Sequence, residues 1–139
     1  MDRLENKVAE LITLVSQYKI IEALTQFYFK DFYAYENTEG PRIGIDKTLF
    51  RIETEKTEMN TLYCLDAKTW MVKGEKSMIH WVCEFKDLTG KYWQVEEVAI
   101  AKWKDGKIYE DKYIYNMPVA IPGPTTEKVL FRNEAVNSN

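Results

Sequence analysis

Residues 95–116, VEEVAIAKWKDGKIYEDKYIYN, decide the fold because they predict a long β-hairpin. The pair Asp105-Gly106 lies between two runs of β-forming residues, which is the strongest short-range hairpin signal. Before this turn, one strand face carries Val95, Glu97, Ala99, Ala101 and Trp103, and the other carries Glu96, Val98, Ile100 and Lys102. Neither face is purely polar, so we expect both to be at least partly covered. A carboxylate such as Glu97 on a covered face costs several kcal/mol unless it is paired or protonated, and it therefore marks a candidate site.

The composition is that of one packed globular domain, since 45% of the 139 residues are hydrophobic and 14% are aromatic. The net charge is −3 and the basic residues are scattered, so we expect no nucleic-acid partner and no anionic membrane surface as a partner. No apolar run approaches the ~20 residues of a membrane-spanning helix. The charged N-terminal residues are unlike a signal peptide, and Cys64 and Cys83 are too few for a disulfide framework. These features predict a cytoplasmic protein with reduced core thiols.

Helical patterns come first along the chain and strand patterns follow. The predicted helices cover residues 2–16, 19–29 and 46–59, and the predicted strands ahead of the hairpin cover residues 32–36, 62–72 and 78–86. Asp46 is the expected N-cap of the third helix. This order predicts an α+β domain over residues 1–116, in which helices cover one face of a curved antiparallel sheet.

The remaining segment, residues 117–139, follows another pattern. Pro118, Pro122 and Pro124 exclude a central strand there, and the end of the chain is polar. We treat the segment as a C-terminal extension that either wraps around the domain or extends away from it.

Several short motifs carry a family resemblance. The most specific are Glu96-Glu97-Val98-Ala99, the WKDGKI segment at residues 103–108, and Tyr113-Ile114-Tyr115. Together with the N-terminal helices and the YEN-x-x-G segment that begins at Tyr35, they resemble the SnoaL-like domains of the nuclear transport factor 2-like superfamily, over about Leu4 to Asn116. The resemblance implies a cone-shaped α+β barrel with a pocket between the helices and the concave face of the sheet. It also implies a homodimer formed through the outer face. The superfamily contains isomerases, polyketide cyclases, dehydratases, epoxide hydrolases and non-catalytic binding modules, so the fold does not name a reaction.

Strand alternation then divides the side chains between the two faces of the sheet. For the outer, dimer-forming face we predict Ile79, Trp81, Cys83, Phe85, Val98, Ile100 and Ile114. For the pocket face we predict Met78, His80, Val82, Glu84, Val95, Glu97, Ala99 and Ala101.

The residues that match the ketosteroid isomerases argue against that reaction. In that family an aspartate general base ends the first strand, and a protonated aspartic acid lies on the strand before the last hairpin turn. The matching positions here are Asn37 and Ala99. Asn does not abstract a carbon-bound proton at neutral pH and Ala does not donate to an oxyanion, so this specific reaction is disfavoured.

His80 and Glu97 are the first candidate catalytic pair. If residues 87–90 form a four-residue loop closed by Lys86 and Lys91, His80 lies directly across from Glu97. A carboxylate orients an imidazole and raises its basicity, which makes a general acid/base unit. The alternative is that His80 only forms a hydrogen bond within the sheet or faces a dimer partner. A slip of one residue moves it to the opposite face.

Asp111 is the third candidate catalytic residue. A bulged turn places Asp111, Tyr113 and Tyr115 inward, whereas a plain two-residue turn places them outward. The tyrosines then donate hydrogen bonds to a ligand oxygen or simply form the wall. The alternative for Asp111 is a surface ion pair.

The end of the first strand supplies further candidate ligand-binding residues, Tyr35 and Asn37. Only one of Glu36 and Asn37 can point inward, and the match to the isomerases favours Asn37. A shifted register reverses the two.

The chain has no metal-binding motif and no nucleotide-binding motif, so we expect neither a metal nor a cofactor. The sequence predicts a pocket for a small, largely apolar ligand with an oxygen function. Cofactor-independent acid/base chemistry of the isomerase, dehydratase, cyclase or hydrolase type is the first hypothesis. A non-catalytic ligand-binding or dimerisation module is the second.

Overall fold

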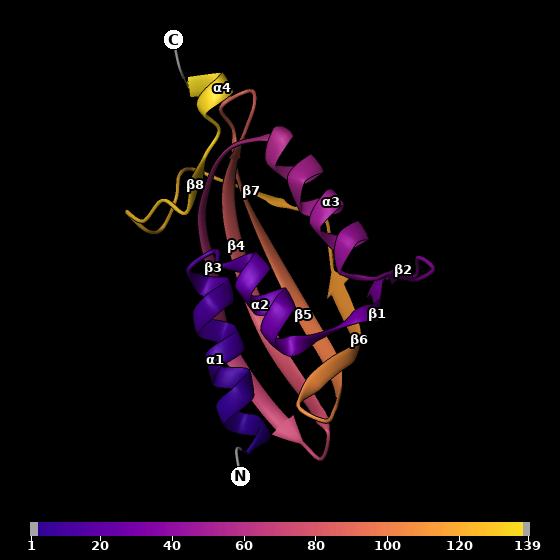
Figure 1. Ribbon diagram of the computed structural model, residues 1–139. Helices are drawn as coiled ribbons and strands as arrows, with labels where there is room; N and C mark the ends of the chain where they lie inside the picture. The colour runs from indigo at the N-terminus through magenta and orange to yellow at the C-terminus, as the bar shows by residue number, and fades with distance from the viewer. Residues whose placement is uncertain (1–2, 138–139) are drawn as a thin grey trace.

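The computed structural model describes residues 3–137 as helices packed on one large curved sheet (Figure 1). The helices are α1 (Leu4–Ser16), α2 (Ile20–Phe27), α3 (Ile45–Thr57) and the short α4 (Glu134–Asn137). The strands are β1 (Tyr28–Glu36), β2 (Arg42–Ile43), β3 (Met59–Lys73), β4 (Lys76–Asp87), β5 (Tyr92–Lys104), β6 (Lys107–Tyr115), β7 (Val119–Ile121) and β8 (Phe131–Arg132).

The sheet follows the order β2-β1-β6-β5-β4-β3-β8, with β7 paired to β5. All pairs are antiparallel except β1 with β6, which run parallel, so the sheet is mixed. Helices α1, α2 and α3 all lie on one side of it (Figure 1). The α+β fold class and the helix-covered curved sheet expected from the sequence are therefore confirmed, but the sheet is not purely antiparallel as predicted, because β1 lies parallel to β6.

The N-terminal helices form as their apolar spacing predicts. Val8 and Leu11 of α1 are buried, and so are Ala23, Leu24 and Phe27 of α2. Helix α2 ends earlier than predicted, because Tyr28 already belongs to β1. Asp46 is not the N-cap of α3. Gly44 occupies that position with φ of 98°, a conformation that a residue without a Cβ adopts readily, and Asp46 lies in the first turn.

The predicted hairpin forms at Asp105-Gly106. Both residues have positive φ, 52° and 79°, as a two-residue primed turn requires. The strands then slip by one residue, because Trp103 pairs with Ile108 while Lys102 pairs with Glu110. Tyr109 is the extra residue of this β-bulge, which returns the following odd-numbered residues to the concave face.

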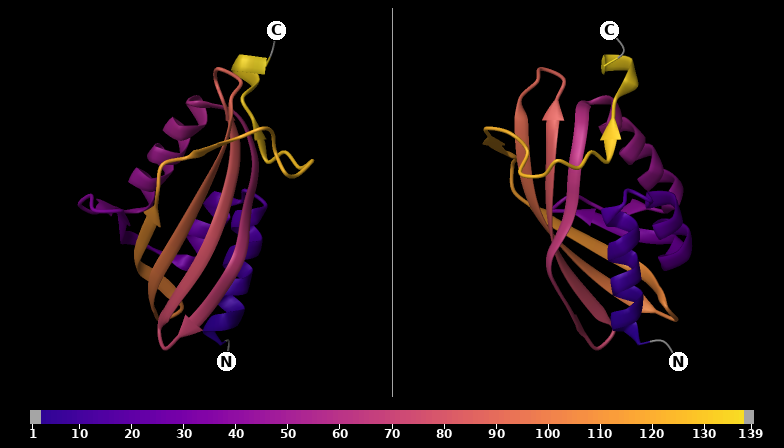
Figure 2. Two further views of the ribbon diagram at one scale, coloured as in Figure 1. Left: turned by 180° about the vertical axis from the view of Figure 1, so that it is seen from behind. Right: turned by 90° about the vertical axis from the view of Figure 1, so that its left-hand side faces the viewer.

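The C-terminal extension wraps around the back of the sheet. Strand β7 pairs with β5, and β8 pairs with β3. Between them the chain crosses the strands on the side away from the helices (Figure 2). There the carboxylate of Glu84, which is 1% exposed, accepts hydrogen bonds from the Thr125 N–H, the Thr125 hydroxyl and the Gln94 amide. The extension is thus fastened to the sheet at three points.

Among residues 3–137, none of the helices has the length and apolarity needed to span a bilayer.

Candidate functional site

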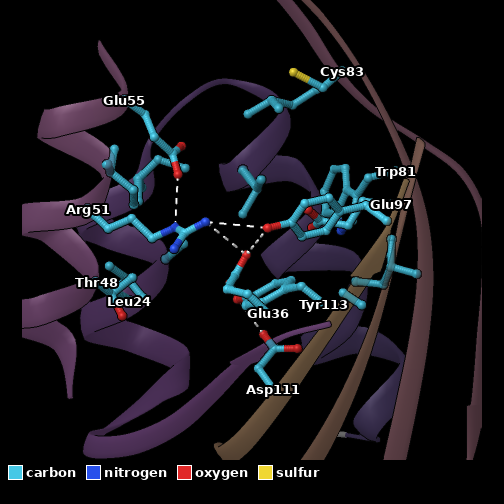
Figure 3. A pocket seen from close by; sticks show the side chains of 18 of the residues that line it. Leu24, Glu36, Thr48, Arg51, Glu55, Trp81, Cys83, Glu97, Asp111 and Tyr113 are labelled. Atoms are coloured by element: carbon cyan, nitrogen blue, oxygen red, sulfur yellow. Dashed lines mark hydrogen bonds and ion pairs between the residues drawn. The ribbon is translucent and has the colours of Figure 1, made fainter. Parts of the chain in front are cut away.

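A cavity of about 490 Å³ lies between the helices and the concave face of the sheet. Its walls are mainly apolar, with Leu11, Val15, Ile20 and Leu24 from the helices and Ile79, Trp81 and Phe85 from β4. Polar side chains gather on the other walls, and Figure 3 labels several of them. They are Tyr28, Glu36, Thr48, Arg51, Glu55, Glu58, Ser77, Glu97, Asp111, Tyr113 and Tyr115.

Asp111 of β6 is the most buried of the cavity carboxyl groups, at 2% exposed. Its Oδ2 accepts a hydrogen bond from the Tyr28 hydroxyl at 2.7 Å and another from the Tyr113 hydroxyl at 2.8 Å. Its Oδ1 is buried and has no hydrogen-bond partner among the described residues. Burial raises the pKa of Asp111 to about 7, although both phenol hydrogen bonds act to lower it. Asp111 therefore titrates near neutral pH.

Glu97 of β5 is the second carboxyl group in the cavity. It faces Tyr115 on β6 and Trp81 on β4. Burial, followed by the nearby charges of Glu36 and Asp111, raises the pKa of Glu97 to about 8. Within residues 3–137, no Lys or Arg forms an ion pair with Glu97 or with Asp111. At pH 7 most Glu97 side chains therefore hold a proton.

A polar network joins β1 to α3 beside these carboxyl groups (Figure 3). Glu36 lies between two guanidinium groups, 3.3 Å from Arg42 Nη1 and 3.3 Å from Arg51 Nη2. Arg51 also contacts Glu55 at 3.0 Å, and the Tyr115 hydroxyl donates to Glu36 Oε1 at 3.0 Å. Both arginines are thus already paired with carboxylates of the protein.

Four of the predicted site residues line the cavity together: Glu97, Asp111, Tyr113 and Tyr115. The bulge at Tyr109 is the reason that the last three face inward, because the Asp105-Gly106 turn itself has only two residues.

His80 does not reach the cavity, and its predicted position opposite Glu97 is wrong. His80 pairs with Val98 on the outer face, and its Nε2 lies 3.7 Å from Glu96 Oε1. The cause is the connection between β4 and β5: five residues, 87–91, separate Lys86 from its partner Tyr92, one more than the four predicted. Asp87 organises this loop, since its Oδ1 accepts hydrogen bonds from the N–H groups of Thr89 and Lys91.

The same shift corrects the predicted faces of β4. Its inward residues are Ile79, Trp81, Cys83 and Phe85, which line the cavity instead of forming the outer face. The outer face carries Met78, His80, Val82 and Glu84 beside Val98 and Ile100. Both cysteines are free thiols, and Cys83 lies on the cavity wall, where burial raises its pKa.

At the end of β1 the predicted orientations of Glu36 and Asn37 are reversed. Glu36 is buried and lines the cavity, whereas Asn37 is exposed with φ of 53° and accepts a hydrogen bond from the Tyr115 N–H. Tyr35 also lies outside, across from Lys112, whose ammonium is 5.8 Å from the centre of its ring. Neither Asn37 nor Tyr35 lines the cavity.

Several polar residues of the cavity were not predicted from the sequence, and Tyr28 and Arg51 are two of them. Tyr28 falls within the helix predicted over residues 19–29, and Arg51 is not among the site residues predicted from the sequence. The spacing of Thr48, Arg51, Ile52 and Glu55 is the signal that indicates a common inward face, since residues three and four apart share one side of a helix. In the part of the chain that the structure describes, no three His, Cys, Asp or Glu side chains are arranged to hold a metal ion.

Comparisons with known proteins identify the fold. No family model and no curated protein matches the sequence itself. Among solved structures, a protein described as a SnoaL-like polyketide cyclase from Mesorhizobium loti matches with a TM-score of 0.66 at 19% identity, over 81% of this chain and 98% of that one. A nuclear transport factor 2-like protein from Burkholderia pseudomallei matches with a TM-score of 0.71 at 13% identity, over 84% and 92%. TerC, co-crystallised with polyporic acid, matches with a TM-score of 0.69 at 13% identity, over 81% and 91%. The fold that the sequence resemblance implied is thus confirmed, and the chain has the nuclear transport factor 2-like α+β fold.

Proposed function

We propose that this protein binds a small, largely apolar, oxygen-bearing ligand in the cavity and moves a proton on it without a cofactor. The observation that carries the proposal is Glu97, a carboxyl group inside an apolar cavity with no cation partner and a pKa raised to about 8. Groups that exchange protons near neutral pH are the efficient general acids and bases, and a perturbed pKa in a cavity is typical of a functional site.

The geometry suggests different roles for the two carboxyl groups. Within residues 3–137 no hydrogen bond restrains the Glu97 carboxyl group, which is only partly buried, so we assign it the proton transfer. Asp111 is fixed by two phenol hydroxyls and is assigned to orienting the ligand. His80 takes no part in this scheme because it lies on the other face, and the hydroxyl of Tyr115, which lies across from Glu97, already donates to Glu36. Isomerisation, dehydration and cyclisation are the reaction types that such a proton transfer serves.

The solved structures support a ligand of this kind without naming one. TerC was crystallised with polyporic acid, and the protein from Mesorhizobium loti is described as a polyketide cyclase. Both share the fold of this chain, so a cavity in this position is suited to an organic molecule of moderate size.

Two measurements test the proposal. Carbon-detected NMR of the side-chain carboxyl groups should show Glu97 titrating well above its ordinary range. Hydrogen–deuterium exchange next to the carbonyl of 1-tetralone, a small cyclic ketone, should be faster with the protein than with buffer alone. Glu97→Gln should lose this acceleration, and Glu96→Gln, which removes the neighbouring outward carboxylate, should keep it. Ordinary titration of Glu97 together with no acceleration would refute the proposal.

Binding without turnover is the second candidate function. The observation that favours it is that the only histidine of the chain lies outside the cavity, so proton transfer there depends on carboxyl groups and tyrosines alone. In that case 1-tetralone binds, and its hydrogens exchange no faster than in buffer.

We also propose that the outer face of the sheet forms a homodimer. Ile114 and Met71 are 52% and 53% exposed there, next to Val98, Ile100 and Met78. The C-terminal extension covers the region around Glu84, which leaves the other end of this face for a second copy. Sedimentation should show a dimer for the natural sequence and a monomer for Ile114→Lys; a natural sequence that sediments as a monomer at micromolar concentration contradicts the proposal.

A further inference from the structure

The charged groups around the cavity do not balance. Its lining holds the acidic residues Glu36, Glu55, Glu58, Glu97 and Asp111 and one basic residue, Arg51. Arg51 is paired with Glu36 and Glu55, and Arg42 adds a second cation to Glu36. Three lining acids have no cation partner among the described residues; Glu58 is exposed, so the two that lie inside the cavity are Glu97 and Asp111. A buried carboxylate without a counter-charge is costly, so the free protein keeps these groups partly protonated.

The two hydrogen bonds to Asp111 favour its charged form, whereas burial opposes it. A phenol has one hydrogen to donate, and both Tyr28 and Tyr113 donate theirs to the same oxygen, Oδ2. A carboxylate accepts two such hydrogen bonds well. The other oxygen, Oδ1, is buried without a partner among residues 3–137. The site is thus arranged around an anion that lacks both a cation and one hydrogen-bond donor.

We propose that the ligand supplies both, as a protonated amine carried on an aromatic or alicyclic body, with its ammonium group on Asp111. This inference rests on the proposed function, because it assigns the ligand class of the same cavity. An ammonium group brings three N–H donors and one positive charge. Trp81 and the rings of Tyr28 and Tyr113 supply aromatic surface for its body and for the cation. Ligands with a carboxylate or phosphate group are disfavoured by the same charges.

A bound cation also changes Glu97. The titratable and charged groups that line the cavity around it come from β1 (Tyr28, Glu36), α3 and its end (Arg51, Glu55, Glu58), β4 (Cys83) and β6 (Asp111, Tyr113, Tyr115), whereas α1 and α2 contribute only uncharged residues. A new positive charge among these acids lowers the pKa of Glu97, so its proton passes to the solvent. Glu97 then becomes a carboxylate base next to the bound amine. The ligand itself would thus convert Glu97 from an acid into a base.

Three molecules with the same ring system test the inference: 2-naphthylmethylamine, 2-naphthalenemethanol and 2-naphthoate. Calorimetry should give the amine about tenfold higher affinity than the alcohol, and the carboxylate the lowest affinity. Amine binding should release protons, seen as an enthalpy that depends on the ionisation enthalpy of the buffer. Its affinity should rise between pH 6 and pH 8, because the carboxyl groups lose their protons in that range.

Asp111→Asn keeps the shape of the side chain and removes its charge. It should lower the affinity for the amine about tenfold and leave that for the alcohol within about threefold. Glu96→Gln removes a charge from the outer face and should change neither affinity. If Asp111→Asn does not fold, the ranking of the three molecules and the proton release with the natural sequence still decide the question. Equal or tighter binding of the alcohol or the carboxylate overturns the amine assignment and leaves the pocket function in place. If none of the three molecules binds, both fail.

Discussion

Glu97→Gln should stabilise the protein at pH 8 and have little effect at pH 4.5. In the folded protein burial raises the pKa of Glu97 to about 8, compared with the ordinary value of 4.5 that describes the unfolded chain. Between these values the unfolded state is ionised while the folded state keeps its proton, so the folded state binds more protons. The contribution of Glu97 to stability is therefore fully present below pH 4.5 and declines until pH 8.

The size of the effect follows from this interval. Each tenfold change in acidity corresponds to about 1.4 kcal/mol, so the interval gives about 5 kcal/mol as an upper value. Glu97 is only partly buried, and water in the cavity reduces the penalty, so we expect about 2–4 kcal/mol at pH 8. Glutamine has nearly the same shape and no charge to desolvate, so the variant avoids this loss.

Urea unfolding followed by tryptophan fluorescence at several pH values measures the difference. The free energy of unfolding of Glu97→Gln minus that of the natural sequence should grow from near zero at pH 4.5 to its largest value near pH 8. Glu96→Gln is the matched control, because its side chain is 66% exposed and should give a small difference at every pH. A Glu97→Gln variant that is equal to or less stable than the natural sequence at pH 8 would refute the reasoning.

Three further substitutions probe other parts of the structure. Tyr113→Phe removes one donor to the Asp111 carboxylate, so the pKa of Asp111 should rise further above 7 in a carboxyl NMR titration. Tyr109→Phe on the outer side should leave this pKa unchanged, and a fall in the pKa of Asp111 in Tyr113→Phe would contradict the assignment. Thr125→Val deprives Glu84 of a hydroxyl donor and should lower the free energy of unfolding by about 1–3 kcal/mol. Amide exchange in β7 should be faster in this variant than in the control variant Glu127→Gln, and unchanged exchange would mean that Glu84 does not hold the extension. Gly44→Ala imposes a side chain at φ of 98°, 3.3 Å from the Lys30 carbonyl oxygen, and should lower the free energy of unfolding by about 1–3 kcal/mol; equal stability would show that α3 begins in another way.

The parts of the fold that depend on local sequence were predictable. The helical spacing of α1 and the Asp105-Gly106 turn act over a few residues, and both appear where the sequence places them. The family resemblance added the order of the layers and the cavity.

The position of His80 was not predictable in this way, because it depends on the length of one loop. Asp87 holds residues 87–91 through its own side chain, and one additional loop residue is enough to turn His80 away from the cavity. The hydrophobic pattern of β4 contains no information about the length of the loop that follows it.

The charged residues of the site depend on contacts between distant segments. Glu36 turns inward, where Arg42, Arg51 and Tyr115 meet it, and these partners come from β2, α3 and β6. The packing of α3 against β1 and β2 brings these side chains together. The carboxyl pair Glu97 and Asp111 was easier to find, because acids in otherwise apolar strands are visible in the sequence.

The single extra residue in β6 has a consequence for how such a domain changes over time. If the same residues paired with β5 in regular register, without the bulge, every following side chain of the strand would turn to the other face, exchanging Asp111, Tyr113 and Tyr115 for Glu110, Lys112 and Ile114 on the concave wall. A sequence change that removes or creates this bulge would therefore change the interior surface while β6 stayed paired with β5. Relatives with quite different ligands can therefore be separated by a step much smaller than the replacement of each lining residue in turn.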